Sequence, residues 1–344
     1  MRKLFSVVLY FVCANAYAQI PEDAIRYSWF TQNGTARTLA IGGVMGSLGG
    51  DISATFVNPA GIGFYKTNEA AVTPGFLMNK IKTYYRGTAL SDEKNKFSFG
   101  TSGFAIALPN LNNENKSNAF SIAFTQKANF HNLIKYKGFN NYSSYSESFA
   151  EELTNQKLAD VLSTQSIAPY TTAPTYLSYL IYIDTLPGGK VVVKTLTDNV
   201  INAGRSLQQE MLKTTKGGLY ELGASYAGND GEKWLWGVGI GIPIISFESN
   251  TVYSETDTSS ITSDQFKSFK FIDNYTTRGA GINGKFGLIF RPKEYIRLGL
   301  AVHTASYMSL TDARKSSLAT VLENPSKDTL VNSGTFTNGN ERGN

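Results

Sequence analysis

Three cations in the last third of the chain are the side chains best placed to bind a ligand. Lys285, Arg291 and Arg297 occupy odd positions in "NGKFGLIFR" and "EYIRLGL", whose even positions are mainly apolar. A strand with this alternation carries the three cations on one face. Because ammonium and guanidinium groups bind carboxylates, these residues are candidates for holding an acidic ligand. The alternative is that they are solvated or paired with acidic residues.

Catalytic and metal-binding patterns are missing from the sequence. The glycine-rich stretch "IGGVMGSLGGD" lacks the spacing of a nucleotide-binding loop, and there is neither a G-x-S-x-G nor an H-E-x-x-H motif. His131 and His303 are the two histidines, too few for the histidine clusters of metal sites. We expect no enzymatic activity, no cofactor and no metal ion, and we expect His131 to be solvated.

The first eighteen residues (1–18) predict a secretory signal peptide. Arg2 and Lys3 precede a short apolar run, and Ala18 ends a sequence that fits a cleavage site. The run is about half of the roughly 20 residues that a membrane-spanning helix needs. Cleavage removes the one cysteine, Cys13, and leaves 30 of the 32 basic residues against 27 acidic ones. This balance gives no reason to expect a nucleic-acid partner.

Period-two alternation of apolar residues dominates the rest of the chain. In "WLWGVGIGIPIISF", residues 234–247, large apolar residues alternate with glycines, which predicts a strand with one apolar and one nearly bare face. The chain has 32 Gly, 21 Phe and 19 Tyr, and 17% of its residues are charged. These features are typical of all-β proteins, either an outer-membrane barrel or a soluble sandwich. We expect seven strands, at about 69–78, 97–108, 118–128, 218–228, 233–247, 276–291 and 295–305.

The connections between these strands favour a transmembrane antiparallel β-barrel. They alternate between short turns and long loops, as such a barrel requires. The long connections are residues 79–96 and residues 130–217. The second has helical composition at 146–163 and 197–218, and its segment 175–195 fits either a short helix or a hairpin. We expect residues 130–217 to form a largely helical cap over the external end.

The number of expected strands has a consequence for the whole barrel. Bacterial barrels have an even number of strands and normally finish on one. Seven strands therefore indicate that residues 67–344 form part of a barrel, and that its C-terminal strands are missing from this sequence. We expect a monomeric barrel.

A stretch without charges precedes the first expected strand. In "GGDISATFVNPAGIGFYKT", no charge occurs between Asp51 and Lys66, and Asn58 before Pro59 favours a fixed turn. Residues 19–66 would begin on the periplasmic side, from where they could fold into the lumen. We call this part of the chain the hatch segment. We expect it to block the lumen, with Asn58, Pro59 and Ala60 as its gating residues.

The segment "GTARTLAIGGVMGSLGGDISATFVNPAGIGFY" resembles the N-terminal hatch of the FadL-like outer-membrane transport family, whose Asn-Pro-Ala motif matches Asn58, Pro59 and Ala60. The later block "GINGKFGLIFRPKEYIRLGLAVHTASYMSLTD" is similar to barrel strands of the Bacteroidetes-type branch of that family. The resemblance implies a barrel of about 14 strands, plugged by its N-terminal segment, which releases hydrophobic substrates sideways into the membrane. Residues 130–217 depart from the external helices of the family.

The hypothesis is a passive channel in the outer membrane of a Gram-negative cell, surrounded by lipid, for hydrophobic compounds such as long-chain fatty acids. Two alternatives remain open. The first is a barrel of the same family that serves as a surface attachment point for exported proteins. The second is a haem-related uptake receptor, for which two separate histidines offer little physical support.

Overall fold

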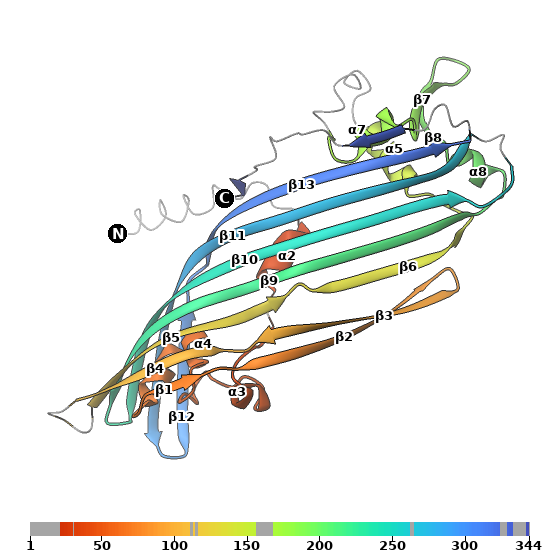
Figure 1. Ribbon diagram of the computed structural model, residues 1–344. Helices are drawn as coiled ribbons and strands as arrows, with labels where there is room; N and C mark the ends of the chain where they lie inside the picture. Colours follow the sequence, from red (N-terminus) through yellow and green to blue (C-terminus); the bar gives the residue numbers. More distant parts are fainter. Residues whose placement is uncertain are drawn as a thin grey trace, which may run out of the picture.

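The computed structural model describes residues 21–29, 31–110, 113, 116–155, 168–261, 265–323, 329–332 and 342–343. The fold is mostly antiparallel β-sheet, which confirms the all-β class (Figure 1). Among the described helices, none is both long and apolar enough to cross a membrane. The expected signal peptide, residues 1–18, lies outside the described residues.

One large sheet has the strand order β1-β4-β5-β9-β10-β11-β13-β14, with β6 paired to β9, β12 to β11 and β15 to β13. Each of the seven ranges expected from the sequence overlaps at least one strand of this sheet. The first range also overlaps β2, and the second also overlaps β3. The strands are β1 (Glu69–Ala71), β2 (Pro74–Tyr85), β3 (Thr88–Phe99), β4 (Ser102–Pro109), β5 (Lys116–Asn129), β6 (Asn132–Asn140), β9 (Leu207–Asp230), β10 (Trp234–Asp257), β11 (Phe266–Lys293), β12 (Ile296–His303), β13 (Tyr307–Leu322), β14 (Thr329–Asn332) and β15 (Arg342–Gly343).

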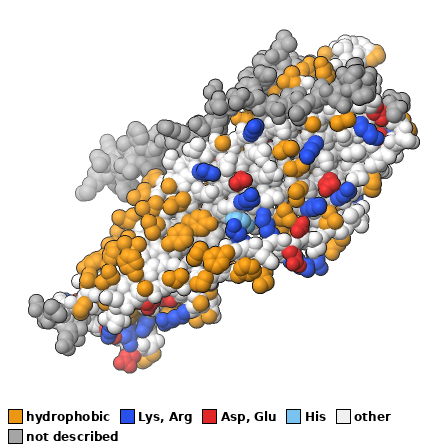
Figure 2. All heavy atoms as spheres, in the orientation of Figure 1, with side chains coloured by type: hydrophobic (Ala, Val, Ile, Leu, Met, Phe, Trp, Pro, Cys, Tyr) orange, Lys and Arg blue, Asp and Glu red, His pale blue; other side chains and the backbone are white. Residues whose placement is uncertain are grey.

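The two faces of this sheet differ as the alternation in β10 predicts. The even-numbered side chains from Trp234 to Ile244 are exposed, with Ile240 at 57%. The intervening Gly237 and Gly241 are buried beneath other parts of the chain. We call the exposed apolar side the outer face and the other the inner face. Figure 2 shows hydrophobic side chains gathered over the part of the sheet near β1, β4 and β12, with charged ones toward the cap and also at the tip beyond the hydrophobic region.

Several strands extend well beyond the expected ranges. Residues 79–96, expected as a loop, belong to the β2–β3 hairpin, whose turn at Arg86 and Gly87 has positive φ angles of 45° and 82°. Residues 207–217, expected as helix, are strand and pair with both β6 and β10. These extensions carry polar side chains on their outer face, so that the apolar alternation used to find strands is absent there.

The inner face is covered by described parts of the hatch segment toward one end and by a cap (residues 146–155 and 168–202) toward the other (Figure 1). The described hatch elements are α2 (Pro21–Ser28), α3 (Ala36–Ala40), α4 (Ala54–Val57) and the 3₁₀ helix η1 (Pro59–Phe64). The described elements of the cap are α5 (Ser146–Asn155), α7 (Thr172–Leu177), β7 (Ile181–Thr185), β8 (Val191–Thr195) and α8 (Asp198–Asn202). The segment that fitted either a helix or a hairpin, residues 175–195, contains the second half of α7 and the β7–β8 hairpin.

An apolar core joins the cap to the sheet. Leu153 from α5 and Leu180 from the start of the hairpin are fully buried, together with Phe266 and Phe269 of β11 and Leu318 of β13. Each of these side chains contributes about 1.5–3 kcal/mol by leaving water. The cap is therefore packed onto the inner face of the sheet.

Glu255 also ties the cap to the sheet. This buried carboxylate of β10 accepts hydrogen bonds from Ser144 Oγ (2.5 Å), the Tyr145 N–H (2.7 Å), Tyr253 Oη (2.7 Å) and Gln209 Nε2 (2.8 Å). Burial raises the pKa of Glu255 above its usual value, against the opposite effect of these hydrogen bonds. Because Ser144 and Tyr145 directly precede α5, the contact fixes where the cap begins.

Replacement of Leu180 should loosen the cap. Leu180→Ala leaves a cavity in a fully buried site and should lower the free energy of unfolding of the cap by about 2–5 kcal/mol. Leu177→Ala is the matched control, since Leu177 is 43% exposed and its loss should cost about 0.5 kcal/mol or less. Limited proteolysis within the cap measures the difference. Equal cleavage rates for the two variants would show that this core does not hold the cap.

Candidate functional site

Asn58 and Pro59 form the fixed turn that the sequence predicts, between α4 and η1. Asn58 is extended (φ −143°, ψ 100°), a conformation favoured before proline, and its Oδ1 accepts a hydrogen bond from the Ala60 N–H (3.1 Å). Pro59 is the first residue of η1. An N–H at this position would have no partner within the helix, so proline, which lacks one, loses no hydrogen bond there. The motif is therefore a cap for the helical turn that follows it.

The carboxamide of Asn58 also joins the hatch segment to the sheet. Its Nδ2 donates to the Gly46 carbonyl (2.6 Å) and lies 3.3 Å from the Leu300 carbonyl and 3.4 Å from the Leu288 carbonyl. Leu288 and Leu300 face each other across the β11–β12 ladder. The side chain of Asn58 is fully buried, so these bonds form away from water. One amide group thus holds two strands and an earlier turn of the hatch segment together.

Bare positions on the inner face make room for this turn. A Cβ added at Gly287 would lie 1.9 Å from Asn58 Oδ1, and one at Gly237 would lie 2.4 Å from the Ala60 nitrogen. Neither distance is possible without movement of the backbone or of Asn58. Glycine is needed at these two positions because the hatch segment approaches the strands so closely.

Lys285, the first of the three predicted cations, lies in a buried charge cluster beneath the hatch segment. Lys285 forms an ion pair with Glu221, and the Nζ of Lys285 also donates to Asn283 Oδ1 (2.7 Å). Glu221 forms a second ion pair with Lys127. The ammonium group of Lys285 lies 5.9 Å from the centre of the Phe56 ring of α4. Removing Glu221, the one acid of the cluster, would leave two cations without their counter-ion, which costs about 3–5 kcal/mol. The cluster therefore has a structural role in this fold.

The other two predicted cations also have partners in the protein. Arg291 forms an ion pair with Glu232 (3.2 Å), in the turn between β9 and β10. Arg297 donates to the Leu48 carbonyl (2.7 Å) and lies 4.6 Å from the centre of the Phe64 ring, so that it binds the hatch segment. The three cations have separate partners, and a role for them in ligand binding stays a prediction.

The sheet divides next to the hatch segment. β2 and β3 pair with each other in a separate two-stranded sheet, whereas β1 and β4, which lie directly before and after this hairpin, belong to the large sheet. β6 pairs with β9 along one edge, and no described backbone ladder joins its other edge to β3. The chain leaves regular strand geometry at residues 72–73, 100–101 and 130–131. Figure 1 shows the β2–β3 hairpin alongside β6.

Both ends of this division are bridged. At the end near the hatch segment, Asn33 Nδ2 donates to the carbonyls of Phe99 (3.1 Å) and Gln126 (2.7 Å), which places residues 31–34 between β3 and β5. At the tip of the hairpin, the rings of Tyr85 and Tyr136 lie 4.5 Å apart. The hairpin is thus attached at its base and tip.

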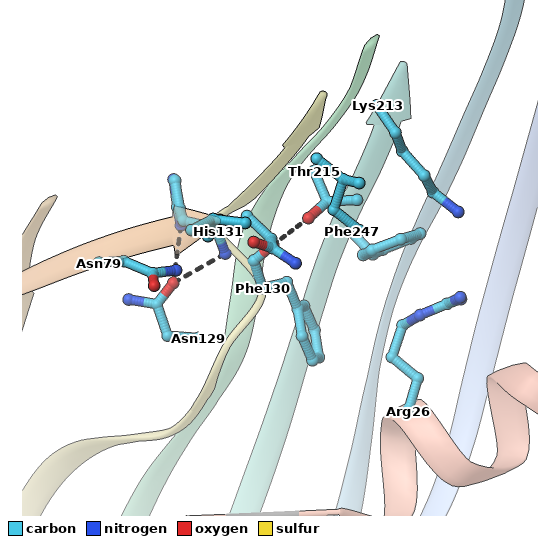
Figure 3. A pocket seen from close by; sticks show the side chains of 11 residues that line it. Arg26, Asn79, Asn129, Phe130, His131, Lys213, Thr215 and Phe247 are labelled. Carbon is cyan, nitrogen blue, oxygen red and sulfur yellow. Dashed lines mark hydrogen bonds between the residues drawn. The ribbon is translucent and has the colours of Figure 1, made fainter. Parts of the chain in front are cut away.

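Between the two attachments lies a cavity of about 600 Å³ (Figure 3). We call it the side cavity. Its walls come from the hatch segment, the hairpin, the β5–β6 junction and the inner face of β9 and β10. The lining residues are Arg26, Asn79, Ile81, Asn129, Phe130, His131, Asn132, Ile134, Lys213, Thr215 and Phe247.

The side cavity combines aromatic rings with positive charge. Phe130 and Phe247 meet edge to face, with ring centres 5.6 Å apart, and the Arg26 guanidinium lies 4.1 Å from the centre of the Phe247 ring. Figure 3 shows Lys213 and Arg26 near Phe247, from β9 and α2. None of the described residues that line the cavity is acidic, although Arg26 also pairs with Asp23. This arrangement can accommodate an apolar group and a carboxylate together.

His131 was expected to be solvated, but it is only partly exposed and lines the side cavity. It lies between β5 and β6, beyond the apolar part of the outer face, and its Nδ1 donates to Asn129 Oδ1 (2.9 Å). Burial, together with the ammonium groups of Lys96 and Lys94, lowers the pKa of His131 below its usual value. The imidazole is therefore neutral at pH 7, and the cations that surround it add to the positive potential of the cavity.

The side cavity was not predicted from the sequence, although one feature of the sequence indicates a break at this place. The alternation of apolar and polar residues stops between Gln126 and Asn132 and resumes in "LIKYKGF". This is a short break inside what is otherwise one strand pattern. His303, which was considered for haem, instead donates from Nε2 to the Val57 carbonyl (2.9 Å). Within the described part of the chain, no group of three or more His, Cys, Asp or Glu residues could hold a metal ion.

No protein-family model matches the chain, and neither does any curated protein or solved structure.

Substitution of Gly287 tests the close contact with Asn58. Gly287→Ala introduces a Cβ where Asn58 already lies and should destabilise the protein by about 1–3 kcal/mol. Gly284→Ala on the same strand is the control, because its Cβ would come no closer than 3.5 Å to another group. Hydrogen exchange of the amides in α4 and η1 should accelerate in the first variant alone. Equal exchange in both would argue against tight docking of the hatch segment.

Proposed function

We propose that the protein is an outer-membrane channel for the passive uptake of hydrophobic compounds such as long-chain fatty acids. In this proposal the strands are part of a closed barrel of about 14 strands, the hatch segment blocks its lumen, and the side cavity is the route into the membrane. The proposal agrees with the resemblance of the hatch segment to FadL-like transporters. The observation that carries it is the side cavity, which lies in a division of the sheet.

The outer face supports the membrane location. The exposed apolar residues of β10 run from Trp234 to Ile244, ten steps of about 3.3 Å along the strand. At a strand tilt of about 40°, this length corresponds to an apolar band about 25 Å tall, the height typical of outer-membrane barrels. Trp234, Trp236 and Tyr226 lie at one end of the run, where aromatic residues gather in such barrels. A water-soluble sandwich gives no reason for so large an exposed apolar surface.

The coverage of the inner face favours a sideways route. The cap core covers the inner face toward one end, and the hatch segment packs against it toward the other. A straight passage along this face would require one of these packed units to move. The side cavity instead reaches from Phe247 on the inner face to Asn79 on the separate hairpin. A compound that enters it needs only the hairpin and β6 to separate slightly.

The lining of the side cavity suggests how a fatty acid would bind. Phe130 and Phe247 would contact the acyl chain, and Arg26 or Lys213 would contact the carboxylate. This assignment replaces Lys285, Arg291 and Arg297 as the first residues to test for ligand binding, since none of those three lines the side cavity.

Filling the side cavity should block uptake. Thr215→Trp places a large ring among the lining residues, and we expect transport of a radiolabelled long-chain fatty acid to fall at least about fivefold, because the route is occluded. Uptake would be measured in cells that lack other transporters of this kind.

Thr214→Trp is the control for this experiment. Thr214 is the neighbouring residue on β9 and lies on the opposite face of the strand. The variant Thr214→Trp should take up the fatty acid at nearly the rate of the unmodified protein, when the two are compared at equal amounts of folded protein in the membrane. Undiminished uptake in Thr215→Trp would refute a route through the side cavity. Absence of any uptake by the unmodified protein would refute the transport function and favour an attachment role.

A further inference from the structure

The outer face changes abruptly beyond the apolar band on the side of the cap. Ile244 of β10 and Ala280 of β11 are paired at the band's edge, and the next outer-face pair toward the cap is Ser246 with Arg278. Lys216 of β9 lies one outer-face position further toward the cap, where it is paired with Glu248, two residues beyond Ser246. At about 3.3 Å per residue, both cations lie within roughly 13 Å of the edge along the strands.

Three exposed cations make up what we call the basic collar: Lys216, Arg278 and Lys315 of β13. None of the three forms an ion pair within the described residues, even though Glu248 occupies a neighbouring outer-face position. Ser246 and Thr311, the cross-strand neighbours of Arg278, are short polar residues that leave its guanidinium accessible. The collar is therefore a net positive surface next to an apolar one.

The opposite edge of the apolar band differs from the collar. There Lys116 forms an ion pair with Asp230 (3.2 Å), and Lys66 and Arg291 share Glu232. These cations are largely neutralised by partners in the protein. Two further cations at this edge, Lys233 and Lys293, form no ion pair within the described residues, so the collar differs from this edge in that none of its three cations is paired.

We propose that the basic collar binds the phosphate groups of an anionic lipid in the leaflet on the side of the cap. This inference rests on the membrane location proposed above. The polar head groups of a bilayer occupy about 5–8 Å beyond each side of its hydrocarbon core, within reach of a Lys or Arg side chain near the edge of the band. Guanidinium groups bind phosphate through two parallel hydrogen bonds, and ammonium groups bind it as point charges. The acyl chains of the same lipid would cover the apolar residues below.

The test measures lipid retained by the purified protein. The unmodified protein is inserted into phosphatidylcholine vesicles that contain a small fraction of diphosphoryl lipid A, extracted in mild detergent and examined by native mass spectrometry. In Lys216→Gln/Arg278→Gln, retention of the phosphorylated lipid should fall about tenfold or more, since each cation near an anionic lipid accounts for roughly a fivefold change in affinity. The matched control is Lys116→Gln/Lys233→Gln at the opposite edge, which should retain it as the unmodified protein does.

A second arm adds inorganic phosphate at millimolar concentration before extraction. A lipid site should keep its lipid, because the acyl chains also contribute to binding, whereas displacement would indicate a site for phosphate ions and overturn the proposal. Equal retention by the two double variants would overturn it as well. Fatty-acid uptake by the single variant Arg278→Gln should be unchanged, since Arg278 does not line the side cavity. Normal uptake without selective lipid retention would reject this inference alone, while failure to insert into vesicles would reject the proposed function too.

Discussion

The buried carboxamide of Asn58 is the contact on which the arrangement of the hatch segment depends. It can form only because Gly237 and Gly287 leave the inner face bare where the turn approaches. A buried amide that loses its partners costs about 1–3 kcal/mol, so the turn has a strong preference for this one position. Once the turn is fixed, residues 31–34 are held near the sheet, where Asn33 bridges β3 and β5. The docking of the hatch segment and the division of the sheet are thus coupled.

A divided sheet needs other partners for its backbone groups, because unpaired strand edges are costly. Side chains supply some of them here. Lys94 Nζ donates to the Asn132 carbonyl (3.3 Å), and Thr83 Oγ1 donates to the Lys135 carbonyl. Side-chain contacts of this kind can open with less loss than a continuous ladder. The side cavity therefore lies beside two strands, β3 and β6, that no described backbone ladder joins, which suits the proposed sideways route.

The sequence predicted the strands that lie in the apolar band, because exposed apolar residues and inner-face residues alternate there, as in β10. It could not reveal that β9 begins at Leu207. Beyond the band the outer face is mostly polar, and the four-residue spacing of Leu207 and Met211 on the inner face also fits a helix, so that only pairing with β6 and β10 shows the strand. The Asn-Pro-Ala turn was readable because Pro59 restricts Asn58 locally. The partners of Lys285 and Arg297 were not, because Glu221 and Leu48 lie far away in the chain. Alternation predicts a face but not what covers it.

The most direct test of the account is to locate a bound ligand. Crystals of the protein grown with a bromine-labelled long-chain fatty acid would reveal the bromine by its anomalous scattering. The account predicts a peak inside the side cavity, near the rings of Phe130 and Phe247, with the carboxylate toward Arg26 or Lys213. A peak elsewhere on the inner face, with the side cavity empty of ligand, would contradict it.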